Sequence, residues 1–125
     1  MLALLLSLKE NTETLREINI NDNWIKQEAV DRLVEVLFRV KKLEKLNISD
    51  SNMGNKAVLM VMRAIKDSVA FETLKELKCN FNEVESSKVA IECMQIMLEM
   101  KNLKVIEFMG NDFSNKIKKE YAIKF

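Results

Sequence analysis

The stretch Leu15-Arg-Glu-Ile-Asn-Ile-Asn-Asp-Asn-Trp-Ile25 has apolar residues at its first, fourth and sixth positions, an asparagine at its ninth and an apolar residue at its eleventh. The same spacing returns three times along the chain of 125 residues. The later copies begin at Leu43, Leu74 and Leu103, at intervals of 28, 31 and 29 residues. Four copies at such even spacing indicate a repeated structural unit rather than a chance match.

The repeated pattern is the leucine-rich repeat consensus, in which each unit is a strand, a turn and a returning helix. Alternation of apolar and polar residues predicts a short strand in each copy. Apolar residues at helical spacing predict helices over about residues 26–40, 55–68 and 86–100, with Ser86 as an N-cap, and a shorter helix over about 114–122. The predicted fold is an α/β leucine-rich repeat solenoid of about four repeats, with a concave parallel sheet and outer helices, of the ribonuclease-inhibitor-like subtype.

Composition predicts one soluble domain over residues 1–125, since 48% of residues are hydrophobic and 31% are charged. The formal net charge of +1 gives no overall field that would attract nucleic acid or an anionic membrane, so neither is an expected partner. The opening segment places Leu2, Leu5 and Leu6 on one helical face. We therefore expect a fragment of a longer array, which self-associates end to end through these leucines.

Asparagines occupy the same turn position in three repeats, at Asn23, Asn82 and Asn111. At this turn the backbone leaves the sheet, and its inward amide and carbonyl groups need partners. A side-chain amide supplies both donors and acceptors, so the three residues predict a structural asparagine ladder. Ser51 is expected to interrupt the ladder, because one hydroxyl cannot replace the full set of amide hydrogen bonds.

The sequence contains no self-contained catalytic constellation. It has no histidine to act as a general base, no glycine-rich phosphate loop and no serine in a nucleophile turn. Cys79 and Cys93 fall on apolar faces and predict buried, reduced thiols rather than a disulfide or a metal site. We therefore expect no catalytic residue, no metal and no cofactor, and favour a binding module over an enzyme.

The candidate partner-binding residues lie at outward strand positions and in the turns that follow the strands. Asp22 and Asp50 occupy equivalent positions in the first two repeats, and the last two repeats bring Phe81 and Met109 to the same edge. Trp24 is either packed over the start of the following helix or an anchor for a partner. The candidate surface consists of Asn21, Asp22, Trp24, Asp50, Phe81 and Met109.

Two of the repeats resemble C-terminal repeats of the Ran GTPase-activating proteins. One is residues 15–23 followed by Gln27-Glu-Ala-Val30, and the other is Leu74-Lys-Glu-Leu-Lys-Cys-Asn-Phe81 followed by Glu83-Val84. The resemblance covers about residues 15–113 and keeps the order of the repeats. It implies a scaffold that supports GTP hydrolysis by the small GTPase Ran, in the cytoplasm or at the nuclear envelope. Such proteins act without an arginine finger and help to order Ran's own glutamine.

The resemblance also limits what this chain does alone. The family's functionally important arginine and asparagine lie in earlier repeats, so the arginines of this chain are not assigned that role. The implied activity of the chain by itself is therefore little or none. The alternative is a generic leucine-rich repeat module whose protein partner is not a GTPase.

Overall fold

The computed structural model describes residues 12–111, in which four short strands form one sheet. The strands are β1 (Glu17–Asn19), β2 (Lys45–Asn47), β3 (Glu76–Lys78) and β4 (Val105–Glu107). They follow one another across the sheet in sequence order, and every neighbouring pair is parallel. The central residues Ile18, Leu46, Leu77 and Ile106 are paired in register. The fold is thus mixed α/β with a small, all-parallel sheet.

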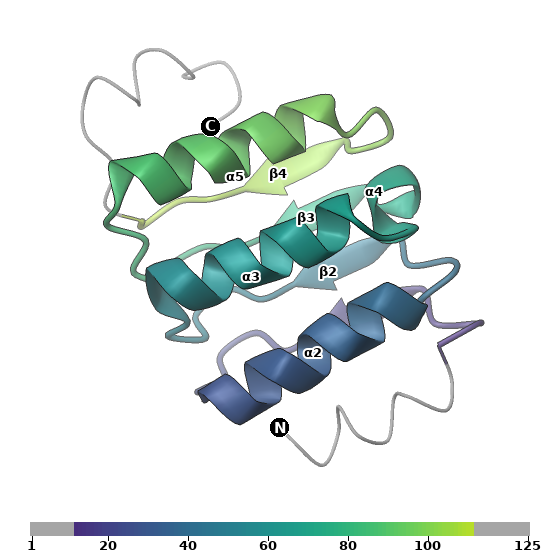
Figure 1. Ribbon diagram of the computed structural model, residues 1–125, viewed down its shortest axis with the longest axis horizontal. Helices are drawn as coiled ribbons and strands as arrows, with labels where there is room; N and C mark the ends of the chain where they lie inside the picture. The colour runs from purple at the N-terminus through teal and green to yellow at the C-terminus, as the bar shows by residue number, and fades with distance from the viewer. Residues whose placement is uncertain (1–11, 112–125) are drawn as a thin grey trace.

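Helices connect each strand to the next. They are α2 (Gln27–Arg39), α3 (Gly54–Lys66), α4 (Ala70–Thr73) and α5 (Ser87–Glu99). The three long helices lie side by side on one face of the sheet, with α3 between α2 and α5 (Figure 1). Their bounds agree with the sequence prediction to about two residues. No helix among residues 12–111 is both long and apolar enough to cross a membrane.

Only one of the three long helices begins at a residue whose side chain caps it. The Ser86 side chain accepts a hydrogen bond from the Val89 amide at 3.3 Å, which confirms the predicted N-cap.

The sequence pattern did not predict α4, which occupies the longest interval between repeats. One helical turn is too short to produce an apolar period. The predicted helix over 114–122 and the three N-terminal leucines lie outside the described residues.

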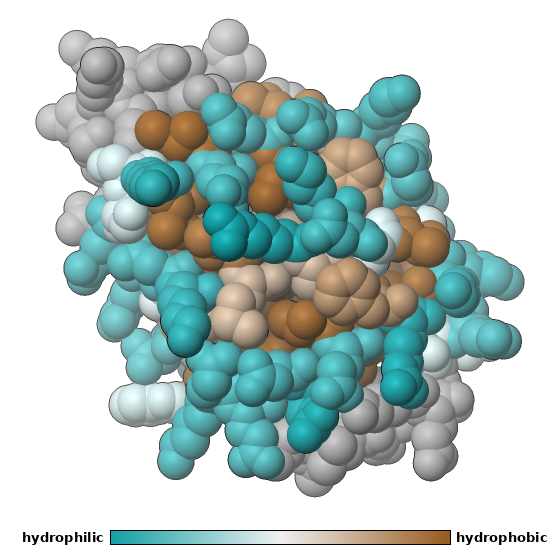
Figure 2. Space-filling model, in the orientation of Figure 1, coloured by the Kyte–Doolittle hydropathy of each residue, from teal (hydrophilic) through white to brown (hydrophobic). Residues whose placement is uncertain are grey.

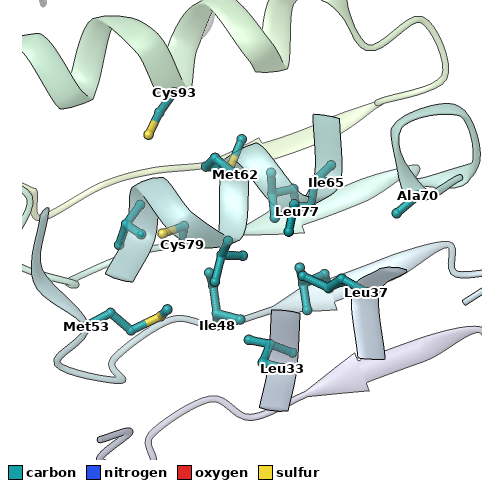
Figure 3. Packing of buried hydrophobic residues seen from close by; sticks show 14 of the residues in the cluster. Leu33, Leu37, Ile48, Met53, Met62, Ile65, Ala70, Leu77, Cys79 and Cys93 are labelled. Carbon is teal, nitrogen blue, oxygen red and sulfur yellow. The ribbon is translucent and has the colours of Figure 1, made fainter. Parts of the chain in front are cut away.

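The hydrophobic core lies between the sheet and the helix layer (Figure 3). Leu46 and Leu77 point into it from the strands, and Leu33 and Met62 meet them from α2 and α3. All four side chains are at most 1% exposed. Each fully buried side chain of this size stabilises the fold by about 1.5–3 kcal/mol. The same burial fixes the orientation of the strands, and with it the direction in which the following turns project.

Both cysteines lie in this core as free thiols. Burial raises the pKa of Cys79 and of Cys93 to about 12 each. Because only the thiolate reacts, neither side chain is expected to react with a disulfide reagent at pH 8 until the protein unfolds. A thiol assay should therefore detect no reactive group in the native protein and two after denaturation. Rapid labelling of the native protein at either position would show that this part of the core opens.

Candidate protein interface at the carboxyl ends of the strands

The turns that follow the four strands place equivalent residues in one row. Asp22, Asp50, Phe81 and Gly110 all have left-handed backbone conformations, with φ angles of 59°, 51°, 55° and 68°. The amide of Asp22 donates to the carbonyl oxygen of Ser49 at 3.1 Å. The Asp50 and Phe81 amides donate in the same way to the next repeat along, at 2.8 Å each. We call Asp22, Asp50, Phe81 and Gly110 the turn row.

Phe81 is the unusual member of the turn row. Aspartate and glycine tolerate the left-handed region, whereas it is unfavourable for a bulky aromatic residue. The Phe81 side chain is nevertheless 52% exposed, and its ring lies where a Cβ atom of residue 110 would be. Glycine at position 110 is therefore needed for the ring to occupy this place. Backbone strain that exposes an aromatic ring indicates a role in recognition more than in folding.

Met109 lies beside Phe81 and is 58% exposed. Its amide donates to the Asn80 side-chain oxygen at 2.8 Å, and its carbonyl oxygen accepts from the Phe81 amide. The Asn80 amide in turn donates to the Ser49 hydroxyl at 3.0 Å. Asn80 and Ser49 thus connect the backbones of adjacent turns next to Phe81 and Met109. The strand alternation places both residues on the concave side, but neither was among the predicted site residues, because their hydrogen-bond partners belong to neighbouring repeats.

All six candidate residues from the sequence are exposed in the structure. Trp24 is 75% exposed, so it is not packed over the start of α2. It belongs to the first repeat, however, whereas Phe81 and Met109 belong to the third and fourth. The structure therefore places all six along one edge, with Asn21, Asp22 and Trp24 at the end formed by the first repeat, Asp50 next to them, and Phe81 and Met109 at the other end.

Ion pairs occupy the open face of the sheet next to this edge. Lys45 lies 4.0 Å from Glu76, and Lys78 lies 3.2 Å from Glu107, in each case across neighbouring strands. Exposed pairs of this kind add little stability. Their effect is to neutralise the centre of the face, whereas Asp22 and Asp50 of the turn row form no ion pair within residues 12–111.

The helix face offers a less continuous apolar surface. Phe38 in α2 and Leu98 in α5 are 50% and 41% exposed. Lys66 of the intervening helix α3 occupies the equivalent position and separates them. Figure 2 shows hydrophobic areas on this face that are divided by rows of hydrophilic side chains. Phe38 is therefore a suitable control for the exposed Phe81.

Two buried asparagines hold the turns beneath the row. The Asn82 side-chain oxygen accepts from the amides of Ser51 at 3.1 Å and Met53 at 3.3 Å. Its amide nitrogen donates to the Ile48 carbonyl oxygen at 2.6 Å. The Asn111 side chain makes equivalent bonds one repeat further on, to the Asn82 amide, the Val84 amide and the Cys79 carbonyl oxygen. Each asparagine therefore ties its own turn to the preceding one.

The first two repeats satisfy the same turn differently. Asn23 is partly exposed, and its side chain donates only within its own repeat, to the carbonyl oxygens of Ile20 and Asn21. The Ser51 hydroxyl also donates to Ile20, at 3.1 Å, while its backbone carbonyl oxygen accepts from the Ile25 amide at 3.2 Å. The Ser51 hydroxyl therefore supplies one of the hydrogen bonds that an asparagine makes at this position. The Ser51 carbonyl oxygen supplies another bond to the preceding turn through the backbone.

The edge combines carboxylates, an aromatic ring and a thioether on turns that hydrogen bonds tie to one another. Within residues 12–111, no group of three histidine, cysteine, aspartate or glutamate side chains could hold a metal ion. Aromatic residues and methionine are both enriched at protein-binding surfaces.

Comparison with known proteins adds information about the fold. No protein-family model matches the chain, and no curated protein matches it. Among solved structures, the chain is similar to one described as leiomodin-1 actin-binding site 2, with a TM-score of 0.77 and 18% sequence identity. The match covers 96% of this chain and 69% of that one. At this identity the similarity concerns the fold alone.

Proposed function

We propose that the chain is part of a leucine-rich repeat array that binds a protein through the turn row and Met109. The repeat assignment is supported by four strands in sequence order and by turns that share one backbone conformation. Asparagine bonds between successive turns support it as well. The observation that carries the binding role is Phe81, an exposed ring held in an unfavourable backbone conformation over Gly110.

As the partner we propose Ran, so that the chain is a C-terminal portion of a Ran GTPase-activating protein in the cytoplasm or at the nuclear envelope. The support is the sequence resemblance of the first and third repeats. Residues of both resembling segments, Asp22 and Phe81, lie in the turn row. The alternative is a partner that is not a GTPase. Actin is a defined test case, because the similar leiomodin-1 structure is described as an actin-binding site.

The proposal is tested by replacing Phe81 with asparagine, which tolerates the left-handed conformation and removes the ring without adding charge. Binding of the chain to Ran loaded with a non-hydrolysable GTP analogue would be measured by calorimetry, with actin in parallel. We expect Phe81→Asn to weaken binding at least tenfold, because exposed aromatic anchors dominate interface energies. Phe38→Gln on the helix face is the matched control and should bind as the unchanged chain does.

The outcomes distinguish a wrong partner from a wrong binding surface. Binding of actin but not Ran, with the same sensitivity to Phe81→Asn, would retain the surface and replace Ran. Equal losses in Phe81→Asn and Phe38→Gln, or no loss in either, would contradict the proposed surface. In single-turnover hydrolysis by Ran, we expect the chain alone to give no acceleration, as the resemblance implies.

A further inference from the structure

Met109 differs from the other methionines of residues 12–111 in its exposure. The sequence places seven methionines in this range. Five of them are at most 9% exposed and belong to the core, namely Met53, Met62, Met94, Met97 and Met100. Met60 is partly buried, and its sulfur accepts a hydrogen bond from the Gln27 side chain at 3.6 Å. Because Met109 is 58% exposed, its thioether is the most accessible one in this part of the chain.

The local structure keeps Met109 on the surface. Its amide donates to the Asn80 side-chain oxygen at 2.8 Å, and its carbonyl oxygen accepts from the Phe81 amide at 2.8 Å. The preceding side chain, Phe108, is 3% exposed and packs in the core. The backbone of Met109 is therefore held by two hydrogen bonds to the preceding turn, and its side chain projects beside Phe81 at the outer edge.

The two thiols do not compete with this thioether for an oxidant. A thiolate reacts with peroxides more readily than a thioether does, and its reactivity follows its ionisation and its exposure. Cys79 and Cys93 are both 0% exposed. Burial also raises the pKa of each thiol to about 12, so neither is ionised at neutral pH. Met109 is therefore the first sulfur that a peroxide in solution meets within residues 12–111.

We propose that Met109 is a site of oxidation to methionine sulfoxide, and that this modification weakens protein binding at the turn row. The inference rests on the proposed function, because it concerns regulation of the same surface. Hydrogen peroxide transfers one oxygen atom to the Met109 sulfur. The peroxide O–O bond breaks, a sulfur–oxygen bond forms, the sulfur undergoes a two-electron oxidation and the peroxide is reduced to water.

The modification changes the chemistry of the surface. A sulfoxide is polar and accepts hydrogen bonds, whereas the thioether is nearly apolar. Burying the sulfoxide beside the Phe81 ring under a partner therefore costs desolvation free energy that the thioether does not cost. In the free chain the sulfoxide at position 109 stays in contact with water. We therefore expect the melting temperature to be unchanged by oxidation at Met109, whereas a sulfoxide at the buried Met62 would lower it.

The test begins with treatment of the native chain with hydrogen peroxide, removal of the peroxide by catalase, and location of the added oxygen by peptide mass spectrometry. We expect Met109 to be oxidised while the core methionines stay unmodified. Binding to Ran loaded with a non-hydrolysable GTP analogue, with actin in parallel, is then measured by calorimetry. We expect oxidation to weaken binding about tenfold. Treatment with methionine sulfoxide reductases should restore the affinity.

Two variants assign the effect to one side chain. Met109→Leu keeps the size and apolar character of the residue and cannot be oxidised, so it should bind as the unchanged chain does and lose no affinity after peroxide. It also keeps Met1, which lies outside the described residues, so any effect of oxidation there would remain visible. Met60→Leu is the matched control in α3 and should lose affinity after peroxide as the unchanged chain does.

The outcomes distinguish the oxidation site, its effect and the proposed function. Equal oxidation of Met109 and the core methionines in the native chain would overturn the site. Oxidation confined to Met109 with unchanged affinity would overturn the regulation and leave the proposed interface intact. Loss of affinity after peroxide in Met109→Leu would also overturn it. If the unmodified chain bound neither Ran nor actin, the proposed function and its regulation would both be contradicted.

Discussion

Replacing Asn82 with alanine is expected to lower the free energy of unfolding by about 3–5 kcal/mol. The change leaves the Ser51 and Met53 amides and the Ile48 carbonyl oxygen without their side-chain partner. Each unpaired buried group costs about 1–3 kcal/mol. Because small domains are stable by only about 5–15 kcal/mol, the substitution removes a large part of the total.

Urea denaturation followed by circular dichroism would measure this loss. Asn23→Ala is the matched control and should cost only about 0.5–1.5 kcal/mol, because that side chain is partly exposed and bonds within its own repeat. Asn82→Ser copies the residue of the second repeat and should lie between the two, which keeps the comparison usable if Asn82→Ala does not fold. Equal losses for Asn82→Ala and Asn23→Ala would contradict the structural role assigned to the buried side chain.

Gly110→Ala is expected to lower the free energy of unfolding by about 2–3 kcal/mol, and by about 1 kcal/mol when Phe81 is already asparagine. Two costs add in the unchanged chain. Alanine is strained at the φ angle of 68°, and its Cβ atom would overlap the Phe81 ring. Without the ring only the first cost remains.

A double-mutant cycle of Gly110→Ala and Phe81→Asn would measure the coupling between the two positions by thermal or urea denaturation. We expect a coupling energy of about 1–2 kcal/mol. Phe81→Asn alone should change stability by less than about 1 kcal/mol, since Asp22 and Asp50 show that a short polar side chain fits this turn. A coupling near zero would mean that the ring moves away from Gly110 at no cost.

The sequence was most informative where local pattern and global packing agree. Most apolar residues at helical spacing lie in the core, and the three long helices match their expected bounds. The period that places Leu15, Leu43, Leu74 and Leu103 in register also brings the strands together in order. Because every repeat uses the same spacing, a strand or helix assigned wrongly in one repeat would have disagreed with its counterparts in the other three.

The site was less predictable because its geometry depends on contacts between repeats. Phe81 and Met109 could be assigned to one edge from the sequence. The ring's place over Gly110 could not, since it depends on a missing Cβ atom in the next repeat. The hydrogen bonds of Asn80 to Ser49 and Met109 likewise depend on residues of neighbouring repeats.

We propose that the turn row and Met109 form the protein-binding surface. This is tested by a titration of the isotope-labelled chain with Ran bound to a non-hydrolysable GTP analogue, observed through backbone amide signals. We expect the signals of Asp22, Asp50, Phe81 and Met109 to shift or broaden first, with those of the exposed faces of α2 and α3 unchanged. Changes confined to the helix face, or no change at an excess of Ran, would contradict the claim.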